Sequence, residues 1–66
     1  MMKQIIVNVN PNSDNYGLFW KFDFGWQDDI YQASQYQPYG FQTPLDGKYV
    51  DFNVALACKE NGVMIS

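Results

Sequence analysis

Residues 18–26 read LFWKFDFGW, and a large apolar side chain stands at every second position. Alternation of this kind is typical of a β-strand with one face on a hydrophobic core, and aromatic residues favour strands. The pattern therefore predicts one unbroken strand, with Phe19 pointing away from the core. The side chains expected in the core are Leu18, Trp20, Phe22, Phe24 and Trp26.

A second strand is expected before this one, over residues 3–9, where Ile5, Val7 and Val9 share one face. The connection, residues 10–17, consists almost entirely of turn-forming residues. Two strands joined by a polar loop can pair in an antiparallel sheet, and we expect that pairing here.

After these strands, residues 28–36 are expected to form one short helix. Asp28 is the expected N-cap, and Asp29 would lie in the first turn, where a carboxylate suits the helix dipole. Residues 37–44 contain Pro38, Gly40 and Pro44 and should be irregular.

The C-terminal third allows two interpretations. Asp46-Gly47 is a turn dipeptide, residues 49–58 alternate between two faces, and Asn61-Gly62 precedes a short apolar run. Asn-Gly between apolar runs is a strong hairpin signal. The alternative is a helix over residues 53–60, with Asn53 as N-cap and Gly62 near the C-terminal end. The hairpin is favoured.

These elements predict a mainly β, small α+β fold: an antiparallel sheet of about four strands with one short helix. At 66 residues, the chain makes a single domain, residues 1–66.

Composition argues against an enzyme and against nucleic-acid binding. The chain has no arginine and no histidine, which removes the usual groups for binding phosphate and for acid–base catalysis near neutral pH. Its net charge is −3, whereas affinity for nucleic acid comes largely from Lys and Arg. Cys58 has no histidine to activate it and is expected to be buried and structural. No cofactor is expected.

One loop has a partial resemblance to a calcium site. Asn10, Asn12 and Asp14 follow the opening of an EF-hand loop, but Asn15 occupies the glycine position and Lys21 the position of the bidentate glutamate. We therefore interpret this segment as a polar hairpin loop, and no metal is expected.

The remaining candidates are acids and aromatic residues. Ten of the twelve aromatic residues lie between Tyr16 and Phe41, more than one face of a small sheet can bury. The surplus could cover the open side of the sheet or form a protein-contact patch with acids around it. The candidate partner-binding residues are Asp14, Asp23, Asp28, Asp29, Tyr31, Tyr36, Tyr39 and Phe41.

The order of several residues resembles a known family. Asn10-Pro11, Gly17, an aromatic strand, Gly25, Asp28-Asp29, Tyr31 and Asp46-Gly47 follow one another as in some small acidic phage anti-CRISPR inhibitors of type I surveillance complexes. The resemblance implies inhibition of such a complex. It also implies that Asp28 and Asp29 match the family's acidic contact positions, with Asp14 as a third.

The sequence thus leads to two functional hypotheses. The first is a small cytoplasmic protein, of the kind that phages encode, which binds a host protein or complex and inhibits it by steric occlusion. The alternative is a self-associating structural or assembly protein, such as a homodimer or a minor phage component, held together by surplus aromatics and an open sheet edge. Neither hypothesis involves a membrane.

Overall fold

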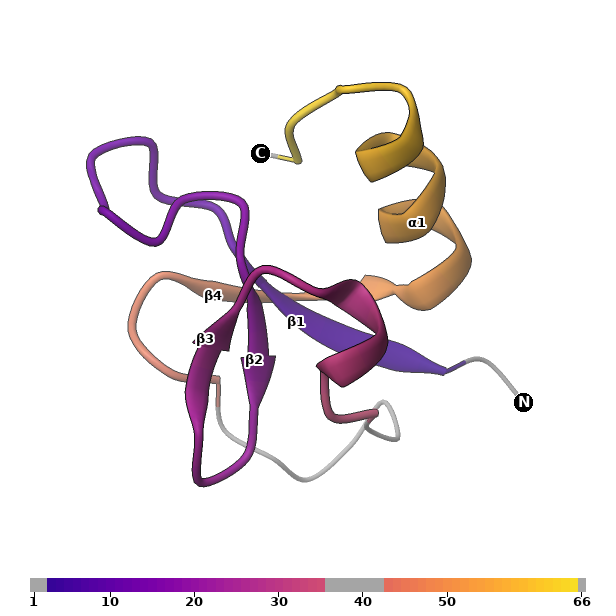
Figure 1. The fold of residues 1–66 in the computed structure, drawn as a ribbon. Helices are drawn as coiled ribbons and strands as arrows, with labels where there is room; N and C mark the ends of the chain where they lie inside the picture. The colour runs from indigo at the N-terminus through magenta and orange to yellow at the C-terminus, as the bar shows by residue number, and fades with distance from the viewer. Residues whose placement is uncertain (1–2, 36–42, 66) are drawn as a thin grey trace.

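The protein folds as one antiparallel sheet with two helical elements, in a computed structural model that describes residues 3–35 and 43–65 (Figure 1). The strands lie in the order β3-β2-β1-β4. This architecture confirms the predicted small α+β class. The elements are β1 (Gln4–Asn8), β2 (Phe19–Lys21), β3 (Gly25–Gln27), the 3-10 helix η1 (Ile30–Gln32), β4 (Gly47–Asp51) and α1 (Phe52–Glu60).

Strand β1 is the centre of the sheet, because it pairs with β2 on one side and with β4 on the other. Four of its five residues, Ile5–Asn8, are buried, and Ile5 and Ile6 have no exposed surface. Neighbouring side chains on a strand point to opposite faces, so both faces of β1 are covered. The predicted strand over residues 3–9 and its pairing across the polar loop are confirmed.

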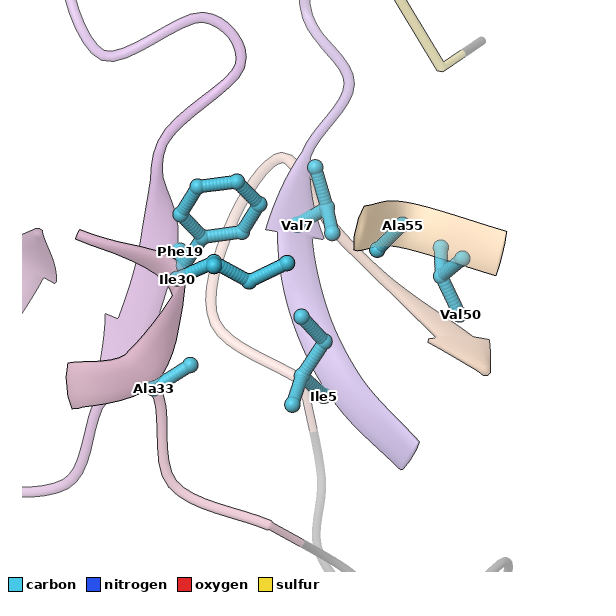
Figure 2. Close-up of a cluster of buried hydrophobic side chains, with 7 residues drawn as sticks. All are labelled: Ile5, Val7, Phe19, Ile30, Ala33, Val50 and Ala55. Carbon is cyan, nitrogen blue, oxygen red and sulfur yellow. The ribbon is translucent and has the colours of Figure 1, made fainter. Parts of the chain in front are cut away.

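The main core lies on the face of the sheet that carries both helical elements (Figure 2). Val7 is directly opposite Phe19, and Ile5 is directly opposite Val50, so these four side chains share that face. Figure 2 shows the side chains that pack over these four residues from η1, from its C-cap residue and from α1. These are Ile30, Ala33 and Ala55.

The second face of the sheet is aromatic. Ile6 pairs with Tyr49, and Trp20 pairs with Trp26 across the β2–β3 hairpin. The two tryptophan rings meet edge to face, with centroids 5.1 Å apart. Such pairs add stability beyond the area that they bury.

The loop between β1 and β2 is ordered by its own polar side chains. Asn8, which is 1% exposed, accepts a hydrogen bond from the backbone N–H of Asn10 and donates one to Ser13 Oγ. Asn10 in turn donates to Asp46 Oδ1 at 3.0 Å, which ties this loop to the turn before β4. The asparagines thus satisfy the buried polar groups of a turn, as expected of a polar hairpin loop.

The single strand predicted over residues 18–26 is wrong, because the chain reverses in its middle. Strand β2 ends at Lys21, and β3 begins at Gly25. Phe22 and Phe24 therefore lie in a turn and are 54% and 72% exposed, whereas Phe19 is 4% exposed and lies in the core. The sequence interpretation placed Phe22 and Phe24 in the core and Phe19 outside it, and the structure shows the opposite for all three.

The prediction of a C-terminal hairpin is also wrong, and the alternative helix is present. Strand β4 ends at Asp51, whose carboxylate accepts the backbone N–H of Val54 at 3.3 Å and caps α1 in place of the expected Asn53. At the other end, the N–H of Gly62 bonds to Lys59 O, and that of Val63 bonds to Cys58 O. With Gly62 at φ +70°, these bonds form a Schellman motif, which ends a helix.

The short helix expected over residues 28–36 is reduced to the single turn η1. Its N-cap is Asp29, which accepts the N–H of Tyr31, and not Asp28. Cys58 belongs to α1 and is only partly buried, so its expected place on a buried strand is wrong as well.

We expect the two phenylalanines Phe19 and Phe24 to differ sharply in their effect on stability. Phe19→Ala should lower the free energy of unfolding by about 3–5 kcal/mol, because it opens a cavity in the core. Phe24→Ala should change it by less than about 1 kcal/mol, since that ring is mostly in solvent. Urea unfolding followed by tryptophan fluorescence measures both, and similar losses in the two variants would contradict this core assignment.

The N-cap of α1 gives a second test. Asp51→Ala should lower the free energy of unfolding by about 1 kcal/mol, because the N–H of Val54 loses its acceptor. Asn53→Ala is the matched control and should be neutral or slightly stabilising, since alanine has the higher helix propensity. Thermal unfolding by circular dichroism compares the two. The reverse ranking would identify Asn53 as the cap.

Candidate functional site

The turn between β2 and β3 presents three consecutive exposed side chains, Phe22, Asp23 and Phe24, which we call the hairpin tip. Folded proteins usually bury rings of this size. The two exposed phenylalanines on either side of an aspartate therefore make the hairpin tip a candidate contact surface.

The backbone of the hairpin tip has a restricted shape. The N–H of Phe24 donates to Lys21 O at 3.0 Å, which closes the turn. Asp23 has φ +67° and Gly25 has φ +87°, both in the left-handed region. Glycine adopts this region freely, and aspartate does so more readily than most residues.

A residue after η1 braces the hairpin tip. Ser34 Oγ accepts the backbone N–H of Phe22 at 2.9 Å, and the N–H of Ser34 donates to Trp20 O at 3.0 Å. The serine thus bonds to the backbone on both sides of Lys21, the last residue of β2. Binding at a braced turn loses less conformational entropy than binding at a mobile loop.

Lys21 provides a further contact between the same two segments. Its Nζ donates to Gln32 Oε1 at 2.9 Å and lies 4.8 Å from the centroid of the Phe24 ring. The ammonium group is thus attracted to the face of the ring. It holds one of the two exposed phenylalanines against the hairpin.

The acids near η1 form a second exposed group. Asp28 and Asp29 are both exposed, and Tyr31 is 71% exposed, with its ring 6.0 Å from that of Phe52. Asp29 is held by its hydrogen bond from the N–H of Tyr31 at 3.0 Å. Two carboxylates and a phenol therefore lie within the four consecutive residues 28–31.

The expected partner-binding residues are only partly brought together. The loop over residues 10–17, which contains Asp14, and the hairpin tip, which contains Asp23, lie at opposite ends of the β1–β2–β3 layer (Figure 1). Tyr36, Tyr39 and Phe41 lie outside the described residues. We use the name aromatic–acid surface for the exposed residues on either side of β3, which are Phe22, Asp23 and Phe24 before the strand and Asp28, Asp29 and Tyr31 after it.

A groove of about 270 Å³ lies between α1, the β1–β2 loop and the C-terminal segment, and we call it the C-terminal groove. Its floor includes the core residues Val7, Phe19 and Ala55. Val63 and Met64 line it as well and are 56% and 50% exposed. Among the described residues that line it, Lys59 is the one charged side chain.

Two features escaped the sequence interpretation. Phe22 and Phe24 were assigned to the core because alternation alone does not distinguish a strand from a hairpin. Gly25, two residues after an aspartate, was the available signal for a turn. The C-terminal groove depends on Met64 packing against Gly17, where a Cβ would be only 2.6 Å from Met64 Cε. A contact between residues as far apart in the chain as Gly17 and Met64 leaves no local pattern in the sequence.

Comparison with protein families, with characterised proteins and with solved structures found no match to this chain. Within residues 3–35 and 43–65, no three Asp, Glu or Cys side chains are close enough to hold a metal ion. In the same ranges, no helix has the length and apolar character needed to cross a membrane.

The strained position of the hairpin tip can be tested directly. Asp23→Gly should leave the free energy of unfolding unchanged or slightly higher, because glycine tolerates φ +67°. Asp23→Val should lower it by about 1–2 kcal/mol, since a β-branched residue is strained in that region. Chemical unfolding measures the difference. Equal stability of the two variants would mean that the tip does not keep this conformation in solution.

Proposed function

We propose that this protein binds a larger host protein or complex and inhibits it by steric occlusion, using the aromatic–acid surface. The observation that carries the proposal is the exposure of three aromatic rings and three acids within residues 22–31, with each ring no more than two residues from an acid. Phe22, Phe24 and Tyr31 are each more than half exposed. Buried aromatic anchors supply most of the energy in many protein interfaces.

The charge of this surface indicates the character of the partner. Asp23, Asp28 and Asp29 are exposed, and the whole chain carries a net charge of −3. Acids beside aromatic anchors favour lysine or arginine on the opposing surface, and they speed the encounter of the two proteins. A basic surface that normally contacts nucleic acid has this character. The surveillance complex of a type I CRISPR system is the narrower proposal, and it rests on the sequence resemblance alone.

The acids can be tested without damaging the fold. Asp28→Lys combined with Asp29→Asn reverses the local charge and keeps an acceptor at the N-cap of η1, because an asparagine oxygen also accepts the N–H of Tyr31. The matched control is Glu60→Lys with Asp46→Asn, which changes the net charge by the same amount elsewhere and keeps an acceptor for Asn10 Nδ2.

In an affinity pull-down from bacterial lysate, the native chain and the control should retain the same host complex. The Asp28/Asp29 variant should capture at least about tenfold less of the host complex than the native chain does, as expected from the removal of close charge pairs. Addition of the native chain should then inhibit the activity of the purified complex. If both variants hold the same proteins as the native chain, or if no protein is retained, the aromatic–acid surface is not an inhibitory binding site.

A further inference from the structure

We propose that the hairpin tip of one copy inserts into the C-terminal groove of another, so that the protein associates head to tail with itself. The tip and the segment that lines the groove lie at opposite ends of the molecule (Figure 1). One copy can therefore offer its tip to one neighbour and its groove to another. Such a heterologous contact uses two different surfaces.

The two surfaces match in size and polarity. Phe24 is 72% exposed at the tip, and the groove has a volume of about 270 Å³ with core side chains at its floor. A protein cavity of about 150 Å³ accommodates a benzene molecule. One phenyl ring therefore fits the groove, and its insertion would bury apolar surface on both copies.

The charges also match. Asp23 lies between the two phenylalanines of the tip, and Lys59 is the one charged side chain among the described lining residues of the groove. An aspartate brought to the groove with the phenyl ring would meet this cation, and no carboxylate is among the described lining residues. The match between these charges makes a second copy a suitable occupant.

Lys59 is held at the groove and still has donors to offer. Its Nζ donates to the backbone oxygen of Asp28 at 3.0 Å and lies 5.5 Å from the centroid of the Phe19 ring on the groove floor. An ammonium group has three N–H donors, and that contact uses one of them. A carboxylate from a second copy can accept another.

This association does not depend on the proposed function. It uses the groove, which lies outside the aromatic–acid surface, and it needs no host protein. The hairpin tip is shared, so a bound host protein and a second copy would compete for it. Asp29 is not among the described lining residues of the groove, and Val63 is not part of the aromatic–acid surface, so variants at these two positions let the two proposals fail separately.

The test is the mass in solution, measured by sedimentation equilibrium from about 10 µM to 1 mM, the range of weak protein contacts. The native chain should rise from 7.7 kDa to more than twice that mass. Phe24→Ser damages the tip, and Val63→Asp puts a negative charge in the groove. Each variant alone should stay monomeric, yet their mixture should form a one-to-one complex that does not grow further.

Matched controls distinguish this contact from nonspecific association through exposed apolar side chains. Val54→Asp makes the same change as Val63→Asp at a helix residue that is 54% exposed, and Leu45→Ser removes an apolar side chain that is 87% exposed. Both control variants should associate like the native chain. Lys59→Glu should abolish association, and Asp23→Lys added to the same chain should restore it by exchanging the two charges. Circular dichroism checks that each variant is folded.

Three results would overturn the proposal. One is a native chain that stays at 7.7 kDa throughout. Another is a folded Val63→Asp or Phe24→Ser variant that still associates alone, which would indicate contact between two like surfaces. The third is a mixture of the two variants that forms no complex.

Discussion

The whole structure depends on burying strand β1 from both sides. A chain of 66 residues with a single cysteine has no internal disulfide to help it fold, so burial of apolar surface must supply most of its stability. Ile5 and Val7 face α1 and η1, while Ile6 faces the aromatic side of the sheet. One five-residue strand thus joins two apolar layers, and the other elements are arranged around it.

Burial of β1 also explains the polar loop that follows it. Asn8 is buried at the end of the strand, and its side chain must find partners within the protein. Residues of the adjacent loop supply them, and the same loop is bonded to the turn before β4 through Asn10 and Asp46. Asn10, the first residue of the pattern that resembles a calcium loop, therefore serves to join two turns.

The aromatic residues divide between buried and exposed positions because the hairpin turns where it does. Phe19 pairs with Val7 in the core, and Trp20 pairs with Trp26 on the opposite face. The turn leaves Phe22 and Phe24 beyond the area that β1 and the helices can cover. An aromatic surface is therefore held by a rigid support, which suits binding to another protein or to a second copy.

The sequence by itself determined the features that depend on neighbouring residues. The strand before the Asn-rich loop, the loop, the turn at Asp46-Gly47 and the small α+β class follow from alternation and turn chemistry. Among the candidate site residues, the exposed pair Asp28 and Asp29 was also recognisable from sequence. Only the tertiary structure decided between helix and strand for residues 52–60 and placed a turn inside residues 18–26. Both segments satisfy two local patterns equally well, so the choice depends on distant contacts: Ala55 against the sheet, and Ser34 against the turn.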